Sequence, residues 1–407
     1  MKNFILFGLI TIVILSGITV PATKHNNLNV SMIKLHSNTF HVGGSGPENY
    51  TTIQDAIDDA TTGDTVYVYN GTYDENLEID KKITLIGENK HTTSINGKQQ
   101  GCTITVSSEY SHIENFTILG GGFDTDEFIN YFRAGIRVTG SHTTIRNNIF
   151  RNNRMGLSGV RVTNLTIQDN MFENDGIGFT CYENDGRPEC KREYFVHTIE
   201  NNTVNGQPFH YYLHQQDQVI ENREMGQLLV VNCTNVTLKN ITISNTDCGV
   251  TYAFCTQCTT EYCTIVNNSI GIWTLHSNKN IFQFNNISHD YDRAVVIDYH
   301  SSYNRFRSNH VASSFCGVEI EWWSNANLIT KNNFINNNVS GYEHQSLFSM
   351  WFRNYYDHWR GLTNPLFFFF PQRIYGMPIE EIPTYVRVVS YDFFPAKQPY
   401  DIEMHWV

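Results

Sequence analysis

The sequence predicts a single-stranded right-handed parallel β-helix, an all-β solenoid with coils of about 22–24 residues. Short apolar segments begin at Leu238, Thr260, Phe282, Phe306 and Ile329, so successive starts lie 22, 22, 24 and 23 residues apart. This period suits a coil of three short strands joined by bends, whereas α-helical solenoids have longer repeats. One repeat cannot bury its own apolar side, so we expect the stacked coils to share a continuous core.

An asparagine in the fourth place of most segments supports this fold. Asparagine tolerates bent backbone conformations, and its side-chain amide can both donate and accept hydrogen bonds. We therefore expect a ladder of amide hydrogen bonds inside one corner of the coil. Similar segments start upstream at Ile113, Ile145, Ile167 and Ile199. The residues in the fourth place are Asn148, Asn170, Asn202, Asn285, Asn309 and Asn332, with Phe116, Ile241 and Cys263 as exceptions.

A short amphipathic helix should cover the N-terminal end of the stack, where a solenoid would otherwise expose its core. Thr51 or Thr52 would serve as the N-cap, and Gly63 follows the helix. The apolar face would consist of Ile53, Ala56, Ile57 and Ala60.

The ends of the chain differ from the repeats. Residues 1–22 hold one lysine and an apolar run, which is typical of a secretory signal peptide. The run is also just long enough for an uncleaved N-terminal membrane anchor. Residues 23–46 are expected to form a linker, residues 47–340 the β-helix with its N-terminal cap, and residues 341–407 an irregular, aromatic-rich C-terminal cap or tail.

Composition narrows the range of partners. The chain has 28 basic and 40 acidic residues and a net charge of −12. Nucleic-acid binding is not expected, because contact with phosphates requires clustered lysine and arginine.

The cysteines of an exported protein suggest disulfides. Five residues before each segment start, the sequence has Cys233 and Cys255, followed in later coils by serines. In adjacent coils their Cα atoms would lie about 5 Å apart, which suits a disulfide or, in a reducing compartment, stacked thiols. A second bridge, Cys181 to Cys190, would close an insertion loop, and Cys263 should be buried and free.

Several stretches resemble known exported β-helix repeat proteins, many of them archaeal. The N-terminal coils carry this resemblance at residues 42–60, 63–69 and 83–89. The repeats, together with residues 205–212 and 227–233, resemble the NosD-like branch of the pectin-lyase-like superfamily.

This resemblance covers roughly residues 42–340 and implies the fold more than an activity. NosD proper is a periplasmic protein implicated in maturing the copper centres of nitrous oxide reductase. The wider fold hosts lyases, hydrolases, epimerases, adhesins and non-catalytic proteins.

Acidic residues gather on one predicted strand face. Side chains alternate along a strand and neighbouring coils lie about 4.8 Å apart, so Asp298 and Glu321 should stack on the outer face, with Glu319 beside them and His300 near. Such a carboxylate pair could perform acid–base or nucleophilic chemistry on a glycan. It could instead bind Ca²⁺ through its oxygens, or form a solvated acidic surface. Asp298, Glu319, Glu321 and His300 are the candidate catalytic residues.

Aromatic residues near this face could stack on sugars. The candidates for substrate binding are Trp273, Trp323, Tyr291 and Arg293.

Copper is the alternative cofactor to Ca²⁺. Cys255, Cys258 and Cys263 lie close in sequence, and histidines lie nearby. These are soft ligands, although the coil register places Cys255 in a turn and Cys263 in the asparagine position, so their side chains should diverge.

The sequence therefore favours an exported protein, extracellular, periplasmic or on the cell surface, that binds polysaccharide or a surface glycan along its outer face. As an enzyme it would be a polysaccharide lyase, a glycoside hydrolase or an epimerase. One alternative is a NosD-like accessory protein that handles copper or assists a partner protein during maturation. The other is a non-enzymatic structural or adhesion module of the cell surface.

Overall fold

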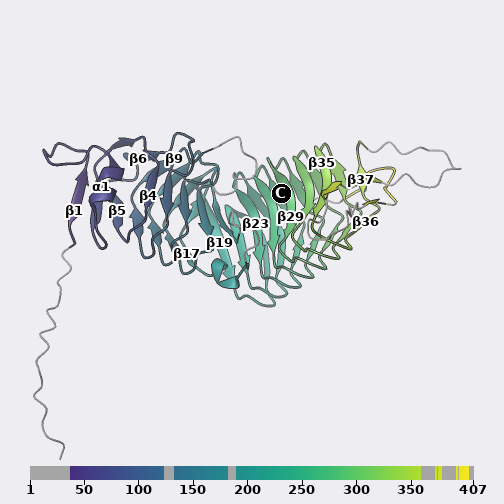
Figure 1. The fold of residues 1–407 in the computed structure, drawn as a ribbon. Coiled ribbons are helices and arrows are strands. Elements are labelled where there is room, and N and C mark those ends of the chain that lie inside the picture. The colour runs from purple at the N-terminus through teal and green to yellow at the C-terminus, as the bar shows by residue number, and fades with distance from the viewer. Residues whose placement is uncertain are drawn as a thin grey trace, which may run out of the picture. The chain divides into compact units, whose positions relative to one another are not determined.

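The computed structural model describes residues 37–122, 133–181, 189–358, 372–373, 375–377, 391–392 and 394–402. Within these ranges the strands stack side by side in chain order (Figure 1). The signal-peptide or anchor segment predicted for residues 1–22 lies outside the described residues. Among the described residues, no helix is both long enough and apolar enough to cross a membrane.

In the N-terminal half, residues 37–204, each complete coil contributes one strand to each of three sheets. The chain passes through β2, β3 and β4 and then returns as β5, which pairs in parallel with β2. This parallel return confirms the predicted β-solenoid. The first sheet contains β1 (Thr39–Val42), β2 (Thr65–Val68), β5 (Thr84–Gly87), β8 (His112–Glu114), β11 (Thr144–Arg146), β14 (Thr166–Gln168) and β17 (Thr198–Glu200). The second contains β4 (Leu77–Ile79), β7 (Ile104–Val106), β10 (Ile136–Val138), β13 (Leu157–Val160) and β16 (Ile177–Thr180).

The third sheet runs through both halves of the molecule, and we call it the shared sheet. Its order is β3 (Gly71–Tyr73), β6 (Thr93–Asn96), β9 (Thr117–Leu119), β12 (Ile149–Arg151), β15 (Met171–Glu173), β18 (Thr203–Val204), β19 (Gln207–Leu213), β21 (Gln227–Val231), β23 (Cys248–Ala253), β26 (Ile270–Leu275), β29 (Arg293–Asp298), β32 (Cys316–Ile320), β35 (Val339–His344) and β39 (Tyr375–Met377).

The fourth sheet completes the coils of the C-terminal half, residues 205–358, and also includes two short strands from later in the chain. Its strands are β20 (Val219–Met225), β22 (Thr237–Ser244), β24 (Thr259–Glu261), β25 (Thr264–Val266), β27 (Ile281–Gln283), β28 (Asn286–Ser288), β30 (Arg305–Arg307), β31 (His310–Ala312), β33 (Leu328–Thr330), β34 (Asn333–Ile335), β36 (Met350–Phe352), β37 (Tyr355–Tyr356), β38 (Gln372–Arg373) and β40 (Tyr391–Asp392).

The chain reverses direction within the shared sheet. Strand β19 is antiparallel to β18, whereas every later pair in this sheet is parallel. Parallel strands are joined by crossovers of a fixed hand. After β18 the strands of the shared sheet run in the opposite direction, while new coils are still added on the same side of the stack. With the same hand of crossover, the interior of the later coils must therefore lie on the opposite face of the sheet.

The residues of the two hydrophobic cores show that the coil interior lies on opposite faces of the shared sheet in the two halves. Val204 faces the core of the N-terminal half, and the same face continues onto Tyr211, Leu229 and Ala253. The other face carries Val230, which belongs to the core inside the C-terminal half. The shared sheet thus separates two interiors, and its inner face in the first half becomes its outer face in the second.

Residues 205–222 interrupt the repeat, and such a segment would be expected from sequence alone to form an insertion on the outside of the solenoid. Most of this segment instead forms β19 and β20, which belong to two different sheets and carry out the reversal. The antiparallel step gives β19 a partner in β18 and offers a new edge to β21.

The N-terminal cap is a helix, α1 (Ile53–Asp59), at the start of the stack (Figure 1). The Thr52 hydroxyl accepts the backbone N–H of Asp55, which is the geometry of a helix N-cap. Ile53, Ala56 and Ile57 are buried. The helix therefore closes the apolar end, as its pattern predicted.

The asparagine ladder is confirmed. The Nδ2–H of Asn309 donates to Asn332 Oδ1 at 3.0 Å and to the Phe282 carbonyl at 2.9 Å. Asn285 donates to Asn309 in the same way, at 3.0 Å. Because each buried amide has partners in the adjacent coils, the ladder fixes coil spacing from inside the core.

Two predicted boundaries need correction. The linker expected over residues 23–46 includes β1, whose residues 39–42 pair with β2. The repeat also continues beyond Gly341: the next coil includes β35, β36 and β37, and Asn354 extends the ladder to the Asp392 carboxylate at 2.9 Å. This coil was not predicted from the sequence, because its repeat spacing changes and its residues are rich in aromatic side chains.

Candidate functional site

A groove of about 550 Å³ lies on the outer face of the shared sheet, where the end of the N-terminal half meets the C-terminal half. Strands β26, β29, β32 and β35 supply its floor, and residues near β13 and β16 supply one side. Among its lining residues are Arg154, Met155, Phe179, Trp273, Arg293, Asp298, Phe315, Glu319, Glu321, Trp322, Tyr342 and His344.

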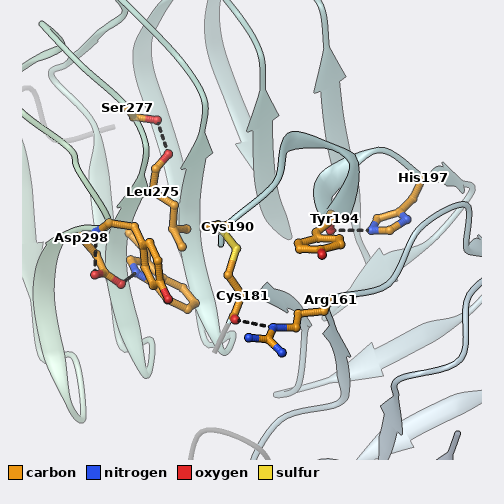
Figure 2. The surroundings of a disulfide bond; sticks show 10 residues. Arg161, Cys181, Cys190, Tyr194, His197, Leu275, Ser277 and Asp298 are labelled. Atoms are coloured by element: carbon orange, nitrogen blue, oxygen red, sulfur yellow. Dashed lines mark hydrogen bonds between the residues drawn. A yellow bond between two sulfur atoms is a disulfide. The ribbon is translucent and has the colours of Figure 1, made fainter. Parts of the chain in front are cut away.

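The N-terminal half closes one end of this groove. Phe179, at the end of β16, and the Cys181–Cys190 disulfide belong to the same apolar core as Leu275 of the shared sheet. Figure 2 shows the disulfide close to Leu275 and Asp298. The outer face of the sheet is therefore covered by protein on this side. The groove is accordingly closed at this end.

Hydrogen bonds across the reversal hold this end in place. Oδ2 of Asp247 accepts the backbone N–H of Gly156 at 2.9 Å and that of Gly176 at 2.6 Å. Gln227 exchanges two hydrogen bonds with the backbone of Ile177, at 2.9 and 2.7 Å. Polar groups of the C-terminal half thus bind the strand starts of the N-terminal half, so the end wall is part of the rigid fold.

Two columns of side chains form the floor. The strand register places Trp273, Val296, Glu319 and Tyr342 in one column, in successive coils. The second column consists of Leu275, Asp298, Glu321 and His344, again in successive coils. The predicted pairing of Asp298 with Glu321 in adjacent coils therefore agrees with the observed register.

Asp298 is nevertheless not an accessible carboxylate. The residue is 0 % exposed. Its Oδ2 accepts the indole N–H of Trp273 at 3.1 Å, and its Oδ1 accepts the backbone N–H of Tyr299 at 2.7 Å. The prediction that this carboxylate faces solvent is wrong, because the N-terminal half covers this part of the outer face.

Glu319 also has a structural partner. Arg293 donates through Nε to Glu319 and through a terminal nitrogen to Asp292. Burial raises the pKa of the Asp292 carboxyl to about 6, while the charge of Arg154 opposes that change. The cationic and anionic groups in this part of the groove therefore compensate one another.

Glu321 is the half-buried carboxyl of the floor. Burial raises its pKa well above the ordinary value for glutamate, and the nearby charges of Asp298 and Glu319 raise the pKa further. A protonated carboxyl can donate a hydrogen bond to a ligand oxygen, whereas an ionised carboxylate can only accept one.

Three predicted site residues lie elsewhere. His300 is exposed in the turn after β29, where its ring lies 5.3 Å from that of His276. Trp323 is half-buried in the following turn. Tyr291 is 78 % exposed and packs near the Arg154 guanidinium. None of these three lines the groove.

The groove includes residues that the sequence interpretation did not select. Trp322, Tyr342 and His344 are half-buried lining residues of the C-terminal half. Tyr342 and His344 could have been found from the repeat. Extending the predicted register by one more coil would have placed both on the outer face. Nothing local in the sequence brings Arg154 or Phe179 to this surface, since their placement depends on the chain reversal.

The described residues do not fit a metal site. Among them, no group of three or more His, Cys, Asp or Glu side chains has an arrangement that could hold a metal ion. The Cys255 thiol lies inside the coil and donates to the Val230 carbonyl at 3.3 Å, and the Cys263 thiol donates to the Glu261 carbonyl at 3.3 Å. The Ca²⁺ site and the soft copper site considered from the sequence are therefore not supported by these residues.

The cysteines divide into one bridge and one column of thiols. Cys181 and Cys190 are bonded, with Cα atoms 5.1 Å apart. Cys233 and Cys255 occupy the predicted column, where the Cys233 N–H points to the Cys255 sulfur at 3.5 Å, but both are free. Cys263 is buried and free as expected. The structure thus has the stacked thiols that were one of the two expectations for the column.

Comparison with known proteins adds two findings on sequence. Residues 196–358 match the model of the family described as periplasmic copper-binding protein (NosD). A cell surface glycoprotein of Methanothermus fervidus is 34 % identical over 125 residues, which are 30 % of this chain and 18 % of that glycoprotein. The chain thus spans less than a fifth of the length of this relative.

Solved structures similar to this chain include the mannuronan C-5 epimerase A-module of Azotobacter vinelandii, with 13 % identity, coverage of 74 % of this chain and 87 % of that chain, and a TM-score of 0.32. Another is DFA-IIIase of Arthrobacter chlorophenolicus, with 11 % identity, coverage of 77 % and 88 %, and a TM-score of 0.35. The described chain is a parallel β-helix protein that matches the NosD family over residues 196–358.

Proposed function

We propose that this protein is exported and binds a glycan in the groove on the outer face of the shared sheet. The observation that carries the proposal is the composition of the groove, in which aromatic rings, the half-buried Glu321 carboxyl and ion-paired side chains surround one concave surface. Its volume of about 550 Å³ lies in the ordinary range for small-molecule sites, so a few sugar units rather than a long polymer would occupy it.

The aromatic side chains supply the expected contact surface. Phe315 is 56 % exposed at the groove, and Trp322 and Tyr342 are half-buried there. The apolar faces of sugar rings pack well against such side chains, while hydroxyl groups require polar partners. Glu321 and His344 offer those partners in the neighbouring floor column.

Export is supported by the apolar N-terminal run and by the similarity to a cell surface glycoprotein. The Cys181–Cys190 bridge agrees with an oxidising compartment. A surface location would place the groove within reach of extracellular glycans.

The proposal can be tested on a glycan array with the chain lacking residues 1–22. Trp322→Ala and Tyr342→Ala each remove a ring from the groove and should weaken binding by at least about tenfold. Tyr303→Ala is the matched control, because Tyr303 is 62 % exposed and does not line the groove. Thermal unfolding of each variant would confirm that it is folded.

Two outcomes would contradict this function. One is the absence of binding to any glycan on an array that includes neutral, amino and acidic sugars. The other is equal loss of binding in the groove variants and in Tyr303→Ala. Either result would favour a structural or adhesion role that does not depend on the groove.

A second candidate function follows from the family match over residues 196–358. A NosD-like accessory protein would act on a copper-containing partner. Since the described residues do not form a metal site, such a role would depend on contact with the partner rather than on copper held by these residues. Anaerobic titration with Cu(I) tests this candidate, and tight stoichiometric binding would show that copper is held by the chain itself.

A further inference from the structure

We propose that the groove binds the uncharged terminal sugar of a glycan chain, held against the end wall, with the rest of the chain leading toward β35. This inference rests on the proposed glycan-binding function and specifies the class of ligand and its direction. It follows from two features of the groove, its closed end and its arrangement of charges.

The closed end comes from the change of interior at β18 and β19. On the N-terminal side of the groove, the outer face of the shared sheet is covered by the core of the N-terminal half, which includes Phe179, Leu229 and Leu275. All three are buried. A ligand on the floor cannot continue past this wall, so a polymer could enter the groove only with one of its ends.

At the opposite end of the floor, the lining residues that the structure describes are partly exposed. Tyr342 and His344, in the last floor strand β35, are both half-buried lining residues. Phe315, just before β32, is the most exposed of the aromatic lining residues. The accessible rings thus lie away from the wall, where successive sugar units of the same chain would pass.

The charges of the floor argue against an acidic sugar. Asp298 ends β29, Glu319 lies in the adjacent strand β32, and Glu321 directly follows β32, so these three acidic residues lie in adjacent coils of the floor. Two of these groups are satisfied within the protein, because Asp298 accepts two hydrogen bonds and Glu319 pairs with Arg293. A ligand carboxylate placed here would meet like charges at short range, which costs affinity.

The cations of the groove do not offset this repulsion. Arg293 already contacts Glu319 and Asp292. Arg154 donates to Ser269 Oγ at 2.8 Å and lies 4.0 Å from Asp292. A uronate would have to compete with these partners for the two guanidinium groups, whereas a neutral sugar needs only hydrogen bonds and ring contacts.

The test compares soluble ligands by isothermal titration with the folded chain. The probes are neutral trisaccharides of glucose, mannose and galactose, the matching polymers at equal mass concentration, and the trimers of galacturonate and mannuronate. We expect one or more neutral trisaccharides to bind. Their polymers should bind in proportion to the number of chain ends, and the uronate trimers should bind at least about tenfold more weakly.

A polymer that binds with a stoichiometry set by its length would show that internal segments enter the groove, and would overturn the closed-end inference. Uronate trimers that bind as tightly as neutral trimers would overturn the charge inference. Both results leave glycan binding itself intact. Failure of every probe, neutral and acidic, would instead reject the proposed function on which the inference rests.

A matched pair of variants locates the effect in the groove. Tyr342→Ala should reduce the affinity for the neutral trisaccharide by at least about tenfold, whereas Tyr303→Ala should leave it unchanged. Comparable weakening by the two variants would place the ligand outside the groove and overturn the inference.

Discussion

Trp273 donates its indole N–H to Oδ2 of Asp298, across one coil of the β-helix, at 3.1 Å. Both residues project from the outer face of the shared sheet, yet their exposed fractions are only 8 % and 0 %. Their burial reflects the overlap of the two halves. In this region the outer face of one solenoid serves as an interior face of the other.

The first prediction concerns this pair. Asp298→Asn should lower the free energy of unfolding by about 1–3 kcal/mol, because an amide cannot accept both the Trp273 and the Tyr299 N–H and leaves one buried donor unpaired. Chemical denaturation measures the change. Asp80→Asn, at an exposed position, is the control. If the two variants are equally stable, the carboxylate of Asp298 does not hold this part of the fold together.

A second prediction tests the internal ladder. Asn309→Leu should lower the free energy of unfolding by about 1–3 kcal/mol, because amide and carbonyl groups in the adjacent coils lose their partners inside the core. Asn338→Leu, at an exposed turn position, should change stability little. A neutral effect at Asn309 would mean that the leucine is accommodated and that the ladder contributes little.

The repeat pattern was sufficient to predict the ladder and the register, because each of these depends on residues at a fixed spacing. Asn309 and Asn332 lie in the predicted column, and Asp298 lies beside Glu321. Both features are local to one coil and its neighbour, and sequence spacing captures them directly.

The side of the sheet that would be buried was not predictable in this way. Alternation along a strand divides residues between two faces, but it does not say which other part of the chain covers each face. Phe179 and Leu275 belong to one buried cluster, and this depends on the antiparallel step at β19, which turns the Leu275 face of the sheet toward the N-terminal half. Since residues 205–222 interrupt the repeat, the spacing carried no information across them.

The third prediction concerns pH. Asp175 and Asp247 are buried close together between the two halves. Burial, followed by the charge of Asp247, raises the pKa of Asp175 to about 8, and burial raises the pKa of Asp247 to about 7. In the unfolded chain both would have ordinary values near 4. The folded state therefore binds these protons more tightly than the unfolded state does.

The sign follows from linkage. A carboxyl with a raised pKa in the folded state contributes stability below its unfolded pKa, and this contribution is lost as the pH rises toward the folded value. As the pH rises from about 4 to the folded pKa, which is about 8 for Asp175 and about 7 for Asp247, each group should lower the free energy of unfolding by up to about 1.4 kcal/mol per pH unit.

Asp175→Asn isolates this contribution, because its amide resembles the protonated acid. The stability of the variant relative to the natural protein should increase from pH 5 to pH 8, as measured by denaturant unfolding at each pH. Asp80→Asn should show no such trend. A difference between Asp175→Asn and the natural protein that stays constant over this range would mean that Asp175 does not titrate there.

The last prediction concerns the thiols of Cys233 and Cys255, which are buried in one column of the C-terminal half and are one coil apart. Adjacent coils place equivalent Cα atoms about 4.8 Å apart, within the range that a disulfide spans. The contact with Cys255 lowers the pKa of the Cys233 thiol to about 7, which favours the reactive thiolate. Oxidation of the folded protein should therefore join these two residues.

Peptide mass spectrometry without reduction measures the link. Cys255→Ser is the control variant, because serines occupy the same place in later coils, where the Ser277 hydroxyl already accepts the Cys255 N–H at 3.0 Å. The variant should fold, lose the new link and keep the bond between Cys181 and Cys190. The competing thiol is Cys258, which also contacts Cys255. Cys233 lies in the coil next to that of Cys255, whereas Cys258 lies in the same turn as Cys255. A dominant link between Cys255 and Cys258 would overturn the predicted pairing.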